Sequence, residues 1–251
     1  MNVIPDLSVC VATTANRPDI LERFLDSVRR MDDHLSIEVI IVDRYGQEKS
    51  SLPAVKSFGS VKLVDADAGC SLPFVLDHAM GISTGRYISL WSDTVVLEPE
   101  SLVRLVAFLD EHPDTGVVAP AMWTAAGDFQ SVARAFPSLL ELSSSSSVPG
   151  PPMTMPGEGG NTEPEWFSGP GLTVNRFLLE ETGGLSEKFL CYWPLEYCLR
   201  AAGAGWHLQY CHEARIIGAE NSWPVERMGR LSLYQAKMAV ALMIVRHRLR
   251  A

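Results

Sequence analysis

The sequence predicts an α/β fold of three layers, α/β/α, with a mostly parallel central sheet. Short apolar runs alternate with helical patterns through the first half of the chain, and this alternation is typical of βαβ units. An aspartate follows two of the apolar runs, at Asp43 and Asp93. Because open parallel sheets bind ligands at the carboxyl ends of their strands, these positions favour a binding site.

The first half supplies the elements of this sheet. Asn16 can cap the first helix, which has Pro18 in its first turn and apolar residues at helical spacing after it. Further helices are expected over Leu72–Ile82 and Glu100–Glu111. We expect strands over Leu7–Ala12, Ile37–Val42 (ending at Asp43), Val61–Val64, Tyr87–Leu90 and Val117–Pro120.

The second half has a different pattern. Ser143 to Pro164 contains five consecutive serines and then proline and glycine without periodicity, so we expect a mobile loop there. Ordered structure is expected again from Trp166 to Ile217, and Met228–Leu249 is predicted to form an amphipathic helix with basic residues at its end. The chain therefore divides into one domain over 1–225, with halves 1–125 and 126–225, and a terminal helical segment over 226–251.

Composition excludes several classes of protein. The 251 residues are 47% hydrophobic and 20% charged, and the net charge of −9 argues against an extended nucleic-acid surface. No charged-then-apolar leader opens the chain, and the apolar run Met238–Val245 is too short to span a bilayer, so we expect a cytoplasmic protein. The five cysteines show neither a disulfide framework nor metal-ligand spacing.

Several segments together resemble one known family. In the first half these are Val9–Pro18, Glu38–Asp43 and Gly81–Thr94; in the second half they are Gly127–Pro137, Trp166–Gly169 and Gly183–Tyr192. Their order and spacing are similar to those of the GT-A glycosyltransferases, specifically the family 2-like group that includes bacterial rhamnosyltransferase-type enzymes. The resemblance runs from about Leu7 to Ser222.

This resemblance implies the GT-A fold and an activity. The activity is transfer of a sugar from a nucleotide-sugar donor to a glycan or other acceptor, with inversion at the anomeric carbon. The resemblance places the donor site in the 1–125 half and the acceptor side in the 126–225 half. By their places in the motifs, the donor site takes Thr13, Asn16, Asp43, Gly81 and Asp93, the acceptor side takes Trp166, Gly169, Tyr192 and Trp193, and the catalytic base is Glu196.

The sequence departs from the family pattern at acidic positions. Trp91 stands where the family has the first acid of its cation-binding pair, which leaves Asp93 alone as a ligand for Mg²⁺ or Mn²⁺. In the family's base motif only Glu196 keeps a carboxylate, because the earlier acidic positions are Trp193 and Pro194. Gly218 stands where a histidine is expected.

Each candidate also has a purely structural explanation. Asp93 can cap the turn after its strand, and Glu196 can be a carboxylate that stabilises the first turn of a helix. Asp43 is either a base-reading or ribose-binding group or a plain strand-end carboxylate, and Glu187 is a second candidate base. Trp91, Tyr192 and Trp193 can form an aromatic wall for a base or sugar ring, or pack in the core.

Three functions remain open from the sequence. The first is a glycosyltransferase, and the second is a catalytically degenerate GT-A module that binds a nucleotide sugar or glycan or partners an active transferase. The third, a nucleotidyltransferase, lacks a glycine-rich, basic phosphate loop after the first strand. The terminal helix can contact an anionic membrane that carries a lipid-linked acceptor, or it can pack within the protein or in a homodimer.

Overall fold

The computed structural model describes residues 4–13, 18–31, 34–44, 53–56, 61–67, 69–144, 151–153, 163–218 and 230–248. Its main sheet has nine strands, in the order β3-β2-β1-β4-β10-β6-β11-β5, with β7 paired to β6. The strands of this sheet are β1 (Leu7–Ala12), β2 (Ile37–Asp43), β3 (Val61–Asp65), β4 (Tyr87–Ser92), β5 (Val96–Leu97), β6 (Thr115–Trp123), β7 (Phe129–Gln130), β10 (Leu172–Asn175) and β11 (His207–Ile217).

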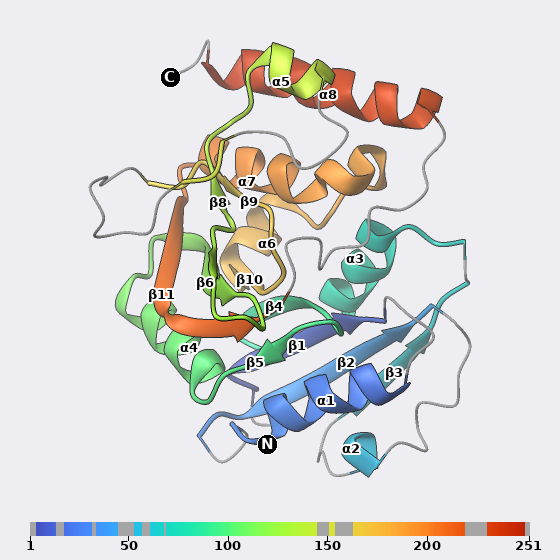
Figure 1. Ribbon diagram of the computed structural model, residues 1–251, viewed down its shortest axis with the longest axis vertical. Helices are drawn as coiled ribbons and strands as arrows, with labels where there is room; N and C mark the ends of the chain where they lie inside the picture. The colour runs from blue at the N-terminus through green and yellow to red at the C-terminus, as the bar shows by residue number, and fades with distance from the viewer. Residues whose placement is uncertain are drawn as a thin grey trace.

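Helices cover both faces of the sheet, which gives the three layers that the sequence predicts (Figure 1). The helices are α1 (Pro18–Arg29), α2 (Pro53–Lys56), α3 (Leu72–Ile82), α4 (Ser101–Glu111), α5 (Leu139–Ser144), α6 (Arg176–Thr182), α7 (Trp193–Gly203) and α8 (Arg230–Arg248), with a 3₁₀ helix η2 (Glu187–Tyr192). Helices α1 and α4 lie on one face, and α3 and α7 lie on the other.

The sheet is mixed but mostly parallel. Strands β3, β2, β1 and β4 form one parallel block, and β6 and β11 form a second parallel pair. Strand β10 lies between the two blocks and pairs antiparallel with β4 and β6. A second sheet of two strands, β8 (Ala133–Arg134) and β9 (Trp166–Phe167), stands apart from the first.

The predicted elements of the first half are confirmed. Strand β1 and helix α3 have the bounds read from the sequence, and β2, β3, β4 and β6 are longer than expected. Strand β4 continues to Ser92 because Trp91 and Ser92 pair with Val11 and Ala12 of β1. The proposed cap of α1, Asn16, lies outside the described residues.

The stretch predicted as a loop contains some ordered structure. Helix α5 extends into it as far as Ser144, and the 151–153 segment lies beside β8, where Pro152 bridges to Arg134. Residues 145–150 and 154–162 lie outside the described residues. The terminal helix is confirmed as α8, and it lies at the edge of the molecule farthest from α1 (Figure 1).

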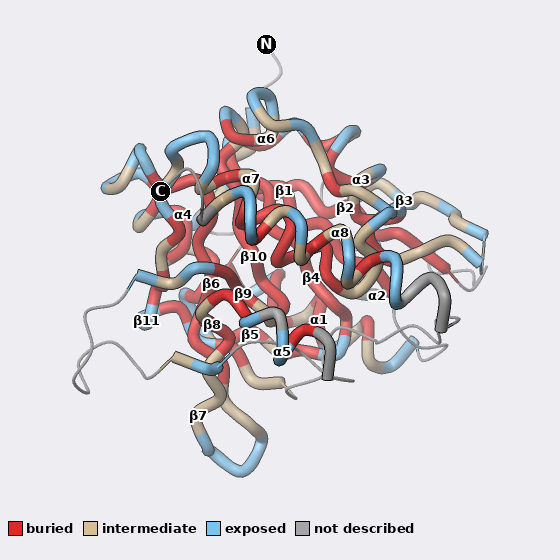
Figure 2. The backbone as a smooth tube through the Cα atoms, turned by 90° about the horizontal axis from the view of Figure 1, so that it is seen from above, coloured by how far each residue is buried: buried red, intermediate tan, exposed pale blue. Residues whose placement is uncertain are grey.

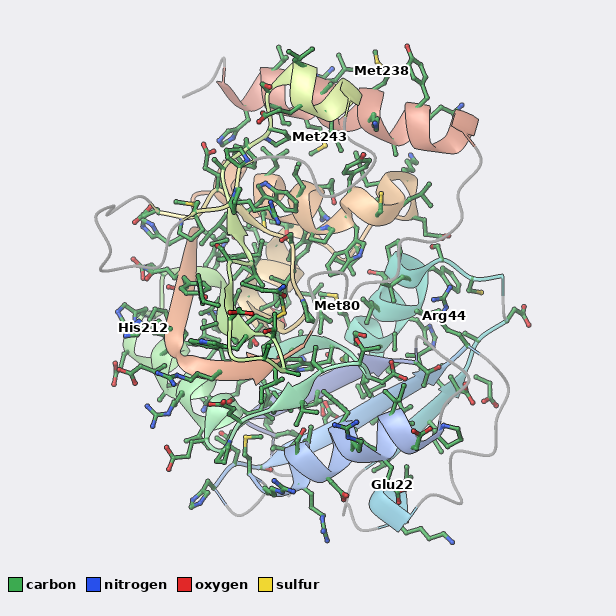
Figure 3. All side chains as sticks on the ribbon, viewed as in Figure 1. Glu22, Arg44, Met80, His212, Met238 and Met243 are labelled. Carbon is green, nitrogen blue, oxygen red and sulfur yellow. The ribbon has the colours of Figure 1, made fainter. Side chains whose placement is uncertain are left out.

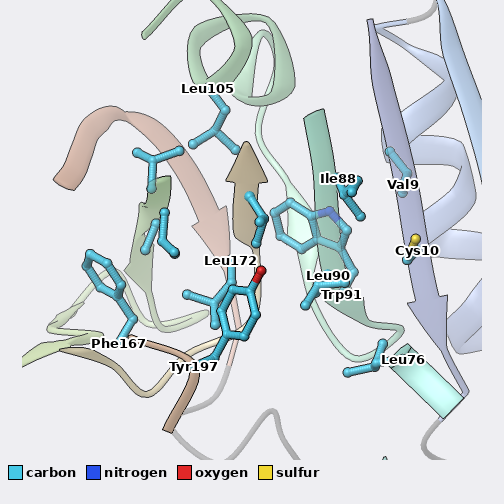
Figure 4. Packing of buried hydrophobic residues seen from close by; sticks show 14 of the residues in the cluster. Val9, Cys10, Leu76, Ile88, Leu90, Trp91, Leu105, Phe167, Leu172 and Tyr197 are labelled. Carbon is cyan, nitrogen blue, oxygen red and sulfur yellow. The ribbon is translucent and has the colours of Figure 1, made fainter. Parts of the chain in front are cut away.

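The core follows the strands, which Figure 2 shows as an almost continuous buried band. Trp91 is fully buried in it (Figure 4). Its ring centroid lies 6.0 Å from that of Phe24. Gly171 adopts a φ of +87°, and a Cβ there would lie 2.6 Å from the Trp91 ring. The glycine before β10 therefore gives the tryptophan its space.

A buried carboxylate joins the amino ends of four neighbouring strands. Glu38, on β2, accepts hydrogen bonds from Ser8 of β1, from Lys62 of β3 and from the backbone of Thr84 and Gly85 just before β4. A Cβ on Gly85 would lie 2.6 Å from the Ser8 hydroxyl oxygen, so only glycine fits at this junction. These bonds fix how the four strands are aligned along their length.

The same bonds make fold stability depend on pH. Burial by itself would raise the pKa of the Glu38 carboxyl, but the hydrogen bonds from Ser8, Thr84 and Lys62 outweigh burial and lower this pKa to about 2. In the unfolded chain a glutamate titrates near its ordinary pKa of about 4.3. The stabilising contribution of Glu38 is therefore complete above that value and is lost as the pH falls from about 4.3 towards 2.

We predict that Glu38→Gln lowers the free energy of unfolding at pH 7 by about 3 kcal/mol, because an amide cannot replace the charge or accept all of these bonds. Urea denaturation at pH 7 and at pH 3 measures it, and the difference between variant and wild type should shrink at pH 3. Glu111→Gln, on an exposed position of α4, is the matched control. A stability of Glu38→Gln equal to that of wild type at pH 7 would rule out this role.

Candidate functional site

The strand register brings three of the predicted site residues together. Ala12, the last residue of β1, pairs with Val42 on one side and with Ser92 on the other. Thr13, Asp43 and Asp93 each come one residue after these partners. Since adjacent parallel strands lie about 4.8 Å apart, the three side chains stand next to one another at the carboxyl edge of the sheet.

Hydrogen bonds connect two of these residues and a third that the sequence did not indicate. The Thr13 hydroxyl donates to Oδ1 of Asp43 at 3.4 Å and accepts from the backbone N–H of Arg44 at 3.2 Å. The Arg44 guanidinium donates to the carbonyl oxygen of Cys70 at 2.7 Å, beside the start of α3 (Figure 3). Arg44 therefore adds a cation to this edge, and its position directly after Asp43 was the only signal in the sequence.

Asp93 is almost completely buried, with a relative exposure of 1%. The two residues before it belong to β4, and the Ser92 hydroxyl bonds to that of Thr94 at 2.8 Å in the turn that follows. A ligand can therefore reach the Asp93 carboxylate only if neighbouring side chains move aside.

The site fits a shared cation better than a cation held by protein alone. No group of three or more His, Cys, Asp or Glu side chains that could hold a metal ion occurs in the described part of the chain. Trp91, at the position where the family resemblance expects the first acid of the pair, is a fully buried core residue and offers no oxygen. Mg²⁺ and similar cations are commonly held by one or two carboxylates together with substrate phosphates. Asp93 satisfies that arrangement only when a ligand supplies the remaining oxygens.

Gly81 does not join this group of residues. It lies in the last turn of α3, next to Ile82, whose carbonyl oxygen accepts from Nζ of Lys62 at 2.9 Å. The same Nζ binds Glu38 at the amino ends of the strands. The predicted donor residue Gly81 therefore lies at the opposite edge of the sheet from Asp93, because α3 runs back from one edge to the other.

The four predicted acceptor-side residues are all buried. Trp166 and Gly169 lie in and just after β9, and Nε1 of Trp166 donates to the carbonyl oxygen of Ala135 at 2.9 Å. Tyr192 and Trp193 lie where η2 passes into α7, and their exposed fractions are small. These aromatic rings pack in the core of the second half, so the structure favours the packing explanation over an exposed wall.

Glu196 has a structural partner for both of its oxygens. Oε1 accepts from Nε of Arg200 at 2.8 Å, and Oε2 accepts from an Arg200 NH2 group at 2.9 Å. Arg200 also donates to the carbonyl oxygens of Thr182, Gly183 and Gly184. The pair thus fixes the turn between α6 and η2 onto α7, and Glu196 is only slightly exposed.

Glu187, in contrast, is exposed and lies near the predicted donor edge. Its Oε2 accepts from the hydroxyl of Ser71 at 3.5 Å, and Ser71 is the residue that caps α3. The start of α3 is held beside the end of β2 through the bond from Arg44 to Cys70. A hydrogen bond also attaches the segment before η2 to α3: Oδ1 of Asp77 accepts from the N–H of Leu185 at 2.7 Å. Glu187 follows Ser71 by 116 residues in the sequence, and the fold brings it back to the start of α3, at the carboxyl edge of the sheet.

A cavity of about 600 Å³ lies elsewhere, between α7 and α8. Arg200, Arg246 and His247 contribute to its walls together with apolar residues. None of the residues at the carboxyl edge, Thr13, Asp43 or Asp93, lines it.

Sequence comparison places the first half of the chain in a known family. The model of "Glycosyl transferase family 2" matches residues 8–146, more than half of the 251 residues. Among curated proteins no significant match is found. Within the described residues, no helix combines the length and the apolar character needed to cross a membrane.

Solved glycosyltransferases have the same fold at low sequence identity. Residues 1–349 of S. aureus TarS superpose with a TM-score of 0.65 at 16% identity, covering 96% of this chain and 65% of that one. GalNAc-T7 with UDP, GalNAc and Mn²⁺ gives 0.71 at 13%, covering 96% and 48%. The mannosyltransferase PcManGT of Pyrobaculum calidifontis, in complex with GDP-Man and Mn²⁺, gives 0.58 at 15%, covering 98% and 72%. The present chain thus spans less than two thirds of the first two of these proteins.

We predict that Glu196→Gln lowers the free energy of unfolding by about 2 kcal/mol, because it removes the charge that faces the Arg200 guanidinium in a mostly buried pair. Urea denaturation provides the measurement. Glu187→Gln, an exposed position, should change stability by less than about 0.5 kcal/mol. If the two variants are equally stable, Glu196 does not have the structural role described here.

Proposed function

Because the chain belongs to glycosyl transferase family 2, we propose that it transfers a sugar from a nucleotide-sugar donor to an acceptor hydroxyl. The observation that carries this proposal is the placement of Thr13, Asp43 and Asp93 side by side at the carboxyl edge of the parallel strands. That edge is where open α/β sheets bind nucleotides.

Each residue at this edge has a role in donor binding. Asp43, oriented by the Thr13 hydroxyl, accepts hydrogen bonds from the base or ribose of the nucleotide. Arg44 offers a positive charge near the donor phosphates. Asp93 binds the ribose hydroxyls or a divalent cation, and Asn16 belongs to the same site by its place in the motif.

Cleavage of the donor requires its diphosphate leaving group to be stabilised. Mg²⁺ or Mn²⁺, when bound, acts as a Lewis acid that neutralises charge on the phosphate oxygens. Asp93 is the residue that would hold this cation, with the donor supplying further oxygens. In titles of the similar structures, Mn²⁺ accompanies UDP in GalNAc-T7 and GDP-Man in PcManGT.

The acceptor hydroxyl must lose its proton to a carboxylate within hydrogen-bond reach. Both oxygens of Glu196 are engaged by Arg200, so we assign this residue to positioning of the turn at Gly183 and Gly184. Glu187 is exposed and lies beside the start of α3, and we propose it as the base. A base on the side of the sugar opposite the leaving group leads to inversion at the anomeric carbon.

The acceptor is proposed to be a glycan or a lipid-linked saccharide, bound on the side formed by residues 126–225. Trp166, Gly169, Tyr192 and Trp193 support this side from within its core. The motif resemblance to rhamnosyltransferase-type enzymes covers this half as well, although it does not identify the sugar.

A second candidate is a GT-A module that binds a nucleotide sugar without transferring it. It is favoured by the buried Trp91 and Trp193 at positions where the family pattern has acids. The two candidates share the donor site but differ in chemistry, so turnover separates them.

We predict that UDP-, GDP- or dTDP-sugars with Mn²⁺ raise the melting temperature, and that Asp93→Asn abolishes the rise. At a donor concentration of about 100 times Kd the stabilisation is about 2.7 kcal/mol. Differential scanning fluorimetry provides the measurement. Glu111→Gln, at an exposed position at the end of α4, is the control and should keep the full response. No response of the wild type to any nucleotide sugar would contradict both candidates.

We also predict that Glu187→Gln reduces sugar transfer or slow donor hydrolysis by about 100-fold or more while leaving donor affinity unchanged, because general-base catalysis contributes about 10²–10⁴-fold. Release of the nucleoside diphosphate measures turnover, and calorimetry measures affinity. Turnover that survives this change would overturn the assignment of the base. Wild-type donor binding without any turnover would favour the binding module.

A further inference from the structure

Helix α8 carries an exposed apolar stripe. Tyr234, Met238, Leu242 and Val245 have relative exposures between 39% and 61%. At about 100° per residue, these four positions fall within about 80° of one another around the helix axis. They therefore form a single continuous face, which we call the outer stripe.

The opposite face of α8 is the one that attaches the helix to the protein. Ala236, Val240 and Ile244 are buried there, against η2 and α7. Figure 3 shows Met243 towards the body of the protein and Met238 on the outer side, and Figure 2 shows buried and exposed segments alternating along the helix. The outer stripe is thus not needed to hold α8 in place.

A second exposed apolar residue lies at the same end of the molecule. Helix α5 contacts α8 there (Figure 1). Leu140 of α5 is 76% exposed, the largest exposure among the large apolar residues of the described chain. A large exposed apolar patch, such as the outer stripe, marks an interaction site.

The charges around the outer stripe indicate what it contacts. Between Arg230 and Arg248 the sequence has four arginine or lysine residues and no acidic residue, although the whole chain has a net charge of −9. At about 100° per residue, Lys237 and Arg246 lie on the two sides of the stripe, and Arg246, which is exposed, also lines the cavity between α7 and α8. A helix with an apolar face bordered by cations has the form of a helix that lies in a membrane interface.

We propose that the outer stripe of α8 docks the protein on the surface of an anionic lipid bilayer. The helix lies parallel to the surface, with Met238 and Leu242 entering the boundary between headgroups and acyl chains. The positive charge that Lys237 and Arg246 place on the two sides of the stripe complements the negative charge of the lipid phosphates. Docking requires no sugar transfer, so it stands or falls independently of the proposed function.

A second copy of the chain fits this surface less well. In a two-fold dimer the same patch faces itself, so the cationic borders of the two stripes would come together. Like charges brought together in this way oppose association. An anionic membrane meets both the apolar stripe and its borders with favourable contacts.

The test is co-sedimentation of the full chain with two kinds of vesicle. One is phosphatidylcholine alone, and the other also contains about 40% phosphatidylglycerol, an anionic lipid that gives the surface a negative potential. We expect binding to the anionic vesicles and at least about tenfold weaker binding to the neutral ones. The double variant Met238→Ser/Leu242→Ser should weaken binding at least about tenfold, because it removes apolar area from the bilayer contact. Lys237→Gln/Arg246→Gln should weaken it by about fivefold per charge.

Matched variants control for general effects on the surface. Phe177→Ser removes an exposed apolar side chain of α6, and Arg29→Gln/Lys56→Gln removes two exposed cations near the other end of the molecule. Both should bind anionic vesicles as the wild type does, and circular dichroism establishes that every variant is folded.

Three results would overturn the proposal. The first is an absence of wild-type binding to anionic vesicles, and the second is equal binding to neutral ones. The third is a dimer in light scattering that Met238→Ser/Leu242→Ser dissociates while vesicle binding is unchanged, which would assign the stripe to a second copy of the chain.

Discussion

The buried carboxylate of Glu38 is the constraint on which the rest of the structure depends. It joins β3, β2, β1 and the start of β4 at their amino ends. Because parallel strands keep their alignment along their whole length, a register fixed at one end is also fixed at the other. The neighbouring positions of Thr13, Asp43 and Asp93 at the carboxyl ends follow from that register.

The two edges of the sheet therefore have separate tasks. The amino edge is held together by the hydrogen bonds of Glu38, whereas the carboxyl edge carries the buried polar side chains of Thr13, Asp43 and Asp93, which we propose to bind the donor. The second half of the chain makes a similar division between Glu196 and Glu187. Glu196 is held by Arg200 inside the protein, and Glu187 is presented to solvent beside the start of α3. The proposed function therefore assigns the chemistry to Glu187, which is exposed, and a structural role to Glu196.

Periodicity was sufficient to predict β1 and α3 with their observed bounds, since both elements combine a uniform apolar pattern with clear ends. It could not reveal β10, which has four residues and pairs antiparallel with strands distant in the sequence. Motif resemblance assigned Asp43, Asp93 and Gly81 to one donor site, whereas in the structure the two aspartates lie at the carboxyl edge and Gly81 lies in the last turn of α3, at the other edge. The engagement of Glu196 by Arg200 and the approach of Glu187 to Ser71 are tertiary contacts that no local pattern indicates.

The central claim is that the carboxyl ends of β1, β2 and β4 form the nucleotide-sugar site. A crystal structure of the chain with UDP and Mn²⁺, or with GDP and Mn²⁺ if only that nucleotide binds, tests it most directly. We expect the nucleoside against Asp43 and the diphosphate beside Asp93. Density for the nucleotide in the cavity between α7 and α8, with the carboxyl edge unchanged, would contradict the account.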